Sequence, residues 1–176
     1  LPLTADKANY TAGDTAQISF NGSANASAYI YIEKAGKIIK SQRVDTKAGT
    51  NTYKIALTKD MAPNVYVHLT LIQPHMQTAN SLPIRLYGVI PLLVDNPETK
   101  LSPVITSADR MEPNKTAKFT VSEASGKPMT YTLAVVDEGL LGLTNFHAPD
   151  LRSEFNKKEA SELQNWDLYK YVINAY

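Results

Sequence analysis

The sequence predicts a mainly β protein, a tandem of antiparallel β-sandwiches in which the second sandwich is incomplete and ends in a helical segment. Three observations predict this fold class. Apolar and polar residues alternate at period two between Thr15 and Val94, a weak repeat recurs after roughly one hundred residues, and the period becomes helical after Pro149. Alternation of this kind buries one face of a pleated strand and exposes the other.

The first half of the chain contains five alternating runs, and each predicts a strand. Turn residues separate the runs, and the stretch from Glu33 to Lys37 predicts a tight hairpin in which Gly36 supplies a positive φ. Short strands at this spacing predict one complete seven-stranded sandwich over about residues 1–97. The apolar rows are Ile18 and Phe20; Ile30 and Ile32; Tyr53, Ile55 and Leu57; Val65, Val67, Leu69 and Leu71; and Leu82, Ile84 and Leu86.

The second half begins like the first and then departs from it. A weak repeat links the two halves: Ala5-Asp6-Lys7 and the run from Thr15 recur as Ala108-Asp109-Arg110 and the run from Thr116. The polar stretch 95–100 marks the boundary between the two parts. Residues 98–176 therefore predict a second unit, with strands to about 143, including Thr130–Val136, and a helical segment at about 150–172 capped by Asp150. So few strands make an incomplete sandwich, and we expect the helix or a neighbouring chain to cover its edge.

Composition excludes several classes of protein. Lys and Arg number 18 against 17 for Asp and Glu, and the net charge of +1 gives no drive toward nucleic acid or acidic lipid. The absence of cysteine excludes disulfides, thiolate nucleophiles, Cys-ligated zinc and iron–sulfur clusters. No apolar run is long enough to span a bilayer. Because the sequence begins at Leu1 without an initiator methionine, we expect an excised piece of a longer protein.

The titratable residues do not predict a reactive site. None of His68, His75 and His147 has a carboxylate or a second histidine at metal-ligand spacing. Asp137 and Glu138 are adjacent and would point to opposite faces of a strand, so we interpret one of them as a cap of a strand end or of the following turn. The sequence therefore predicts no catalytic residue, no cofactor-binding residue, no metal ligand and no enzymatic activity.

Other polar and aromatic residues have structural interpretations. Lys37, Lys40 and Arg43 predict a basic strand edge that resists sheet-to-sheet aggregation. Trp166 and Tyr169 predict core packing of the helical segment. Asn-Xaa-Ser/Thr triplets matter only in a host that glycosylates them, and they occur at Asn9, Asn21, Asn25 and Asn114.

One long stretch resembles a known family. The run Tyr131–Phe146, which contains Ala134-Val135-Val136-Asp137-Glu138-Gly139-Leu140-Leu141, then Ala148-Pro149-Asp150 and Asp167-Leu168-Tyr169, resembles the segment that leads into the bait region of bacterial α2-macroglobulins. The start of the chain, Ala5-Asp6-Lys7 with Tyr10 and Gly13-Asp14-Thr15-Ala16, resembles the opening of the family's macroglobulin-like domains. Together these matches cover nearly the whole chain.

This resemblance implies a fold and a function. Residues 1–97 would form one macroglobulin-like β-sandwich, and 98–176 would form the first part of another, ending at the expected start of the bait region. The chain would be a structural segment of a broad-spectrum endopeptidase inhibitor that traps proteases after bait-region cleavage. Many members also carry a Cys–Gln thioester, which this cysteine-free chain cannot hold.

The resemblance also implies partners and a location. The partners would be proteases, through the full-length protein, and other macroglobulin-like domains of the same chain, with no nucleic acid and no direct membrane contact from this segment. The location would be the periplasm or cell envelope.

Two other functions remain open from the residues. The first is a surface or periplasmic sandwich tandem for adhesion or glycan binding, with Tyr29, Tyr31 and Tyr66 as the candidate aromatic platform. The second is an accessory module of an enzyme.

Overall fold

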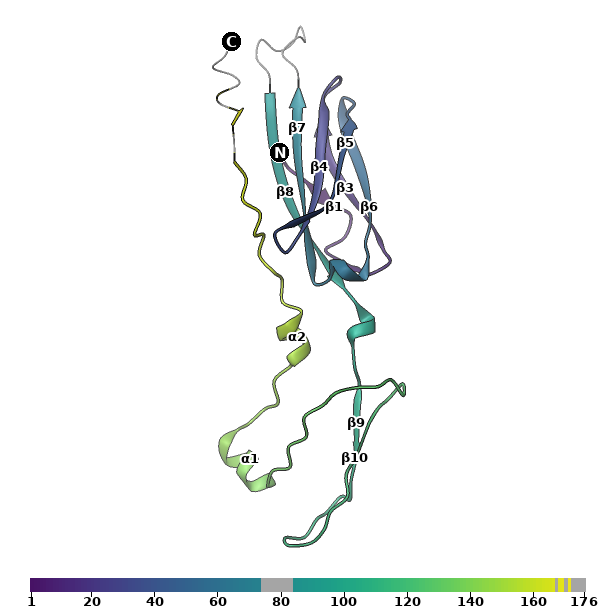
Figure 1. Ribbon diagram of the computed structural model, residues 1–176, viewed down its shortest axis with the longest axis vertical. Helices are drawn as coiled ribbons and strands as arrows, with labels where there is room; N and C mark the ends of the chain where they lie inside the picture. The colour runs from purple at the N-terminus through teal and green to yellow at the C-terminus, as the bar shows by residue number, and fades with distance from the viewer. Residues whose placement is uncertain (74–83, 167, 170, 172–176) are drawn as a thin grey trace. The chain divides into compact units, whose positions relative to one another are not determined.

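The computed structural model describes residues 1–73, 84–166, 168, 169 and 171 (Figure 1). Contacts divide the chain into two compact units. Unit 1 consists of Leu1–Pro97 together with Asn156–Tyr176, and unit 2 is Glu98–Phe155. Unit 1 thus includes the segment that begins at Asn156. The sequence alone predicts this segment to belong to the second unit, with residues 98–155.

Unit 1 is built from two β-sheets, as Figure 1 shows. One sheet has the strand order β1-β3-β6, and the other has the order β2-β8-β7-β4-β5. Neighbouring strands are antiparallel except for β2 and β8, which are parallel. The mainly β fold with antiparallel sheets is confirmed. The strands are β1 (Thr4–Ala5), β2 (Asn9–Thr11), β3 (Thr15–Gly22), β4 (Ser27–Lys34), β5 (Lys37–Asp45), β6 (Gly49–Ala56), β7 (Asn64–Gln73) and β8 (Ile84–Asp95).

The described part of unit 1 has eight strands where the sequence predicts seven, because the first extended segment changes sheet. β1 pairs with β3 in one sheet, and β2 pairs with β8 in the other. Asp6 lies between β1 and β2 and fixes this change of direction. Its Oδ1 accepts hydrogen bonds from the Gln17 N–H and the Tyr10 hydroxyl, both at 2.7 Å. These two donors lower the pKa of Asp6 below its usual value.

The core lies between the two sheets and follows the predicted alternation. Ile18 and Ile55 from the smaller sheet are 1% exposed, and Val67 and Leu69 from the larger sheet are fully buried. These side chains recur at every second residue, so each strand presents one face to the other sheet. Burial of this apolar surface is the main force that holds the sandwich together.

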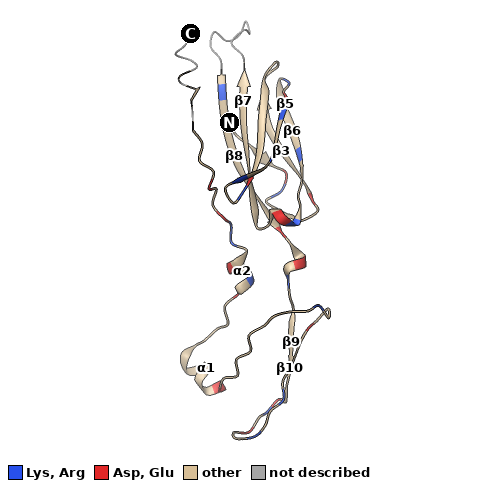
Figure 2. Ribbon diagram, in the orientation of Figure 1, with Lys and Arg blue, Asp and Glu red and all other residues tan. Residues whose placement is uncertain are grey.

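The hairpin predicted at residues 33–37 is confirmed. β4 and β5 pair through Lys34 and Lys37, and both intervening residues, Ala35 and Gly36, have positive φ. Two such residues are typical of the tight turn that suits twisted strands. β5 is an edge strand, and Figure 2 shows both signs of charge spread over the unit. Lys37, Lys40 and Arg43, which the sequence predicts to form a basic strand edge, all belong to this edge strand.

β8 departs from the predicted apolar row. Leu82 lies outside the described residues, and Ile84 and Leu86 are 37% and 41% exposed. The buried apolar side chains of β8 come later, at Leu92 and Val94. The predicted row lies at the wrong end of the strand, because apolar alternation alone does not show which part of a long strand faces the other sheet.

Unit 2 contains four short elements among its described residues. β9 (Pro103–Thr106) pairs with β10 (Thr120–Glu123), and α1 (Glu138–Thr144) and α2 (Leu151–Phe155) follow. Short 3₁₀ helices occupy Lys59–Met61 in unit 1 and Pro97–Thr99 at the division between the units. Among the described residues, no helix combines the length and the apolar character that crossing a bilayer requires.

Two sequence predictions are wrong in this part of the chain, and a third is met only in part. Thr130–Val136 is not a strand, because no strand among the described residues pairs with it to complete its hydrogen bonds. Glu138–Thr144, where the sequence predicts strands to about 143, is a helix. The helical segment expected at about 150–172 is found only in part: α2 ends at Phe155, residues 156–166 are not helical, and residues 169 and 171 are helical. Leu163 and Trp166 have the spacing of a helical face without the tertiary packing that most helices need.

Glu123 at the end of β10 gives a pH prediction for unit 2. Its carboxylate accepts hydrogen bonds from the Ser125 hydroxyl and from the N–H groups of Ser102 and Ser125. These donors, the Ser125 hydroxyl above all, lower the pKa of Glu123 from its ordinary 4.5 to about 2. Because this pKa is lowered, the carboxylate stabilises the turn fully above pH 4.5, and this stabilisation is lost as pH falls through about 2.

An NMR titration of the Glu123 carboxyl carbon should therefore show a midpoint near pH 2. Glu123→Gln should speed amide exchange at Ser102 and Ser125, because the ionised acceptor is gone. A midpoint at the ordinary value of 4.5 would contradict this account of the turn.

Candidate functional site

The outer face of β4, β7 and β8 carries polar and aromatic side chains, opposite the core. The register places Tyr31 of β4 beside His68 of β7, and Glu33 beside Tyr66. Alternation predicts this arrangement, since His68 lies between the buried Val67 and Leu69 and so points the other way. Such a face is ordinarily wet in an antiparallel sandwich. Here it is covered.

Glu33 and His68 form a buried polar pair on this face. They are 0% and 2% exposed, and His68 Nε2 lies 2.9 Å from Glu33 Oε2. The other ring nitrogen, Nδ1, lies 2.6 Å from the Tyr87 hydroxyl. The Tyr31 ring stacks on the imidazole with ring centroids 4.7 Å apart and planes 8° apart. These partners fix the imidazole on both nitrogens and on one ring face.

The Glu33 carboxylate receives four donors. Its Oε2 accepts from His68 and from the Ser161 hydroxyl, and its Oε1 accepts from the N–H groups of Glu162 at 2.9 Å and Gly36 at 3.3 Å. An ionised carboxylate accepts about four such bonds and donates none, so this arrangement fits the charged form. Burial raises the pKa of Glu33, but the four donors outweigh it and leave the pKa below its ordinary value.

Residues 159–165, which we call the strap, lie on this face of the sheet and contact side chains of β4, β7 and β8. At one end, the Glu159 N–H donates to Asn64 Oδ1 at 2.8 Å, and the Glu159 carbonyl accepts from Asn64 Nδ2 and the Tyr66 hydroxyl. The Glu159 carboxylate pairs with Lys34 Nζ at 2.7 Å. Figure 1 shows the segment running alongside β8. The contacts that attach this end all involve a side chain of the sheet.

The other end of the strap is held by Asn165. Its Oδ1 accepts a hydrogen bond from the Tyr31 hydroxyl at 3.2 Å, and its Nδ2 lies 3.5 Å from the Tyr87 hydroxyl. Burial, together with Tyr87 and Glu33 nearby, raises the pKa of Tyr31 to about 12, so Tyr31 stays neutral and donates. Ser161 and Glu162 hold the middle of the strap through Glu33.

This cluster is not arranged for nucleophilic catalysis. Ser161 contacts the Glu33 carboxylate, while both nitrogens of His68 are engaged by Glu33 and Tyr87. A serine nucleophile requires a base within reach of its own proton, with a third group orienting that base. Among the described residues, no group of three or more His, Cys, Asp or Glu is placed to hold a metal ion. The arrangement can hold a segment of chain in place.

The structure separates the other residues that the sequence singled out. His147 is exposed in unit 2, and His75 lies outside the described residues. Asp137 caps α1 by accepting from the Gly139 N–H at 2.8 Å, so the predicted cap is found at the start of a helix. Trp166 is 86% exposed, and the prediction that it packs in a core is wrong, because residues 156–166 are not a helix with a buried face.

The three tyrosines of the expected platform are engaged differently from one another. Tyr29 is 41% exposed, Tyr31 stacks on His68, and the Tyr66 hydroxyl binds the strap. A flat ligand such as a sugar needs ring faces that are open together. The arrangement therefore does not favour an aromatic platform at these positions.

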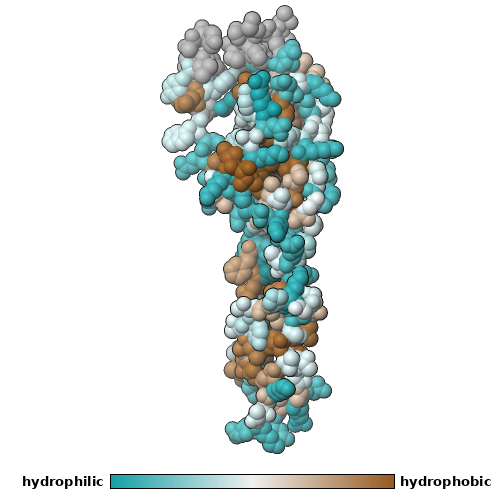
Figure 3. Space-filling view, turned by 45° about the vertical axis from the view of Figure 1, so that its right-hand side comes forward, coloured by the Kyte–Doolittle hydropathy of each residue, from teal (hydrophilic) through white to brown (hydrophobic). Residues whose placement is uncertain are grey.

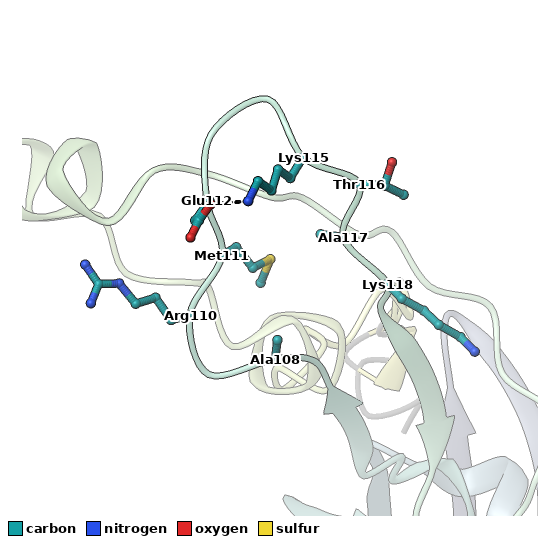
Figure 4. Close-up of a pocket in the computed structure, with 8 residues that line it drawn as sticks. All are labelled: Ala108, Arg110, Met111, Glu112, Lys115, Thr116, Ala117 and Lys118. Atoms are coloured by element: carbon teal, nitrogen blue, oxygen red, sulfur yellow. Dashed lines mark ion pairs between the residues drawn. The ribbon is translucent and has the colours of Figure 1, made fainter.

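Among the described residues of unit 2, the two hollows below do not gather polar groups toward a ligand. The loop between β9 and β10 encloses about 430 Å³, lined by Ala108, Arg110–Glu112 and Lys115–Lys118 (Figure 4). Glu112 and Lys115 pair with each other at 2.6 Å, while the side chains of Arg110 and Lys118 point away from the hollow (Figure 4). Figure 3 shows apolar side chains at the surface of this unit, where a second hollow of about 510 Å³ lies among Leu133, Val135, Leu141 and Phe146. Ligand sites ordinarily combine apolar walls with converging polar groups.

Sequence reasoning missed Glu33 and the strap. The sequence does show polar residues that alternate with the apolar residues of two strands. They are Tyr29, Tyr31 and Glu33 in one strand, and Tyr66 and His68 in the other. Polar rows of this kind are also ordinary on a wet outer face, so they do not by themselves predict a cover. Only the fold shows that residues 159–165 lie on this face, since about 130 residues separate Glu33 from Ser161 along the chain.

Comparisons with known proteins agree with this architecture. A family described as alpha-2-macroglobulin bait region domain matches residues 1–143. The alpha-2-macroglobulins of Xylella fastidiosa strain 9a5c and Escherichia coli strain K12 are 26% and 24% identical over 99% and 98% of this chain. The chain spans only 11% of the length of each of these relatives.

A solved structure shows the same fold. The native conformation of E. coli alpha-2-macroglobulin, seen by electron cryomicroscopy, matches with a TM-score of 0.52 and 20% identity. The match covers 90% of this chain and 10% of that one.

Proposed function

Because the chain belongs to the alpha-2-macroglobulin bait region domain family, we propose that it is a structural segment of a protease-trapping inhibitor. In this proposal the segment holds one end of an exposed stretch of chain that proteases cut. The cut frees that end, and the large protein rearranges around the protease. The segment itself contributes order and attachment and no reactive group.

One observation carries the proposal beyond family membership. The strap is tied to the sandwich along its length, at Asn64, Glu33 and Tyr31, although the region before it in unit 2 has little regular structure. A cleavable stretch has to be flexible enough to enter a protease cleft. Its flank has to be ordered if a single cut is to change the balance between two arrangements of the protein.

The rest of the proposal concerns the whole protein. Its partners are endopeptidases, through the full-length chain, and the neighbouring macroglobulin-like domains, with residues 1–97 as one such domain and 98–176 as part of the next. Its location is the periplasm or the cell envelope. The support is the bacterial origin of the alpha-2-macroglobulins that the chain resembles.

The test uses the full-length protein and a broad-specificity serine protease. We expect cleavage C-terminal to the strap, at a site that N-terminal sequencing locates, and co-elution of the protease with the cut protein in size-exclusion chromatography. The retained protease should still hydrolyse a small chromogenic peptide but should lose activity on a large protein substrate, because a trap excludes only large molecules.

The control is the same protease, first inactivated by a covalent active-site reagent. It should elute at the volume of the free protease, separately from the full-length protein, since it cannot make the cut. If the active protease leaves this region intact, or cuts it and elutes alone, the proposed function is wrong.

A further inference from the structure

The strap and the sheet beneath it are held by different forces. The sheet strands bury a continuous apolar row against the other sheet, whereas the strap side chains are exposed except for Leu163, which is half-buried. Apolar burial supplies most of the stability of a folded domain, and local openings occur where it is scarce. The strap can therefore detach at a far lower free energy than the sandwich unfolds.

We propose that the strap opens and closes as one unit on the folded sandwich, and that the ionised carboxylate of Glu33 holds it closed. Glu33 is where the strap and the sandwich meet. Ser161 and Glu162 donate to it from the strap, while His68 and Gly36 hold the same carboxylate from the sandwich side. The acceptor is thus already oriented before the strap arrives, which lowers the entropy lost on closing.

The contacts at the two ends of the strap support closure but are weaker. The ion pair between Lys34 and Glu159 leaves the Glu159 side chain 47% exposed, and exposed pairs of this kind contribute little. The bonds from Asn165 are long, at 3.2 and 3.5 Å. Hydrogen bonds to a buried charge are the stronger class, so Glu33 should account for most of the closure.

Acid should open the strap. The titratable groups around Glu33 are His68 on β7, Tyr31 on its own strand and Glu162 on the strap, with Lys34 and Glu159 paired alongside. Because the four donors lower the pKa of Glu33, its contribution is complete above the ordinary value of 4.5 and is lost as pH falls through the lowered pKa.

This inference rests on the contacts within unit 1 and stands whether or not the proposed function is correct. If that function holds, strap opening is the step that lets a cut chain end leave the sandwich. The experiment below involves no protease, so it can fail or succeed independently of the trapping experiment.

The test is amide hydrogen exchange of the whole chain, followed by NMR at single residues. The N–H groups of Glu159 and Glu162 should exchange more slowly than in an unstructured peptide and faster than those of Val67 and Leu69 in β7. Glu33→Gln should speed exchange at both strap positions by about tenfold or more, because one charged acceptor is removed. It should speed exchange in β7 by a smaller factor, because the contact between Glu33 and His68 is altered as well. Lowering pH should have the same effect in the unaltered chain, after correction for intrinsic exchange.

Two further variants make the result decisive. Ser161→Ala removes a donor on the strap without altering the sandwich, and it should also speed exchange at Glu162. Asp45→Asn changes an exposed carboxylate on β5 that contacts Ser27 and Arg43, and it should change neither strap nor sheet. The proposal is overturned if the strap amides exchange like a free peptide in the unaltered chain. It is equally overturned if they exchange together with β7, or if Glu33→Gln and Ser161→Ala leave them unchanged.

Discussion

Replacing Leu69 by alanine should lower the free energy of unfolding of unit 1 by about 2–5 kcal/mol. Leu69 lies near the middle of β7, is fully buried, and pairs with Ile30 on one side and Gly88 on the other. Both neighbouring strands fix its position, so the shortened side chain leaves a cavity that the sheet cannot close. The loss combines the apolar burial of the missing atoms with the dispersion attraction that the walls of the cavity no longer receive.

Urea unfolding followed by far-ultraviolet circular dichroism measures this change. Unit 2 has only two four-residue strands and two short helices among its described residues, so the signal reports mainly the sandwich. The midpoint should fall, with the slope against urea unchanged. Ile38→Ala is the matched control, because Ile38 lies on edge strand β5 and is 54% exposed. It should alter stability by about 0.5 kcal/mol or less, and equal losses for both variants would contradict the assigned core.

The sequence predicts the sandwich of unit 1 well because its strands obey a local rule. One apolar residue at every second position is sufficient to assign β3, β4, β6 and β7, and Gly36 marks the hairpin. The split between β1 and β2 is not local. It depends on the Asp6 carboxylate reaching Gln17 and Tyr10, a contact that no periodic pattern reports.

Unit 2 shows where pattern reasoning stops. The β-branched run from Thr130 to Val136 has the composition of a strand, yet a strand forms only when a partner takes up its hydrogen bonds. Conversely, Glu138–Thr144 becomes a helix although it follows a strand-like run, since Asp137 caps its first turn and Asn145 ends it in the left-handed region. Local capping decided the structure there.

The candidate site illustrates the same limit. Alternation correctly predicts His68 on the outer face, but spacing along the chain gives this histidine no carboxylate partner. The partner, Glu33, comes from the neighbouring strand through sheet register. Register is a property of paired strands, so a contact of this kind can be inferred only after the pairing is known.

Replacing His68 by leucine should lower the free energy of unfolding by about 1–3 kcal/mol. The change leaves the buried Glu33 carboxylate without one of its four donors and removes the partner 2.6 Å from the Tyr87 hydroxyl. A buried charge with an incomplete set of partners is costly, because the dry surroundings cannot replace the missing bond. If the strap opens, water can reach Glu33 and hydrate its carboxylate. The free energy of unfolding lost in His68→Leu therefore cannot exceed the free energy needed to open the strap.

The double variant His68→Leu with Glu33→Leu separates charge from packing. Because both polar partners are then absent, no carboxylate is left unpaired, and we expect at least half of the lost stability to return in the same urea experiment. If the double variant is no more stable than His68→Leu alone, the loss comes from packing against Tyr31 and not from the stranded carboxylate. If His68→Leu is as stable as the unaltered chain, water already reaches Glu33, and the strap does not seal the pair.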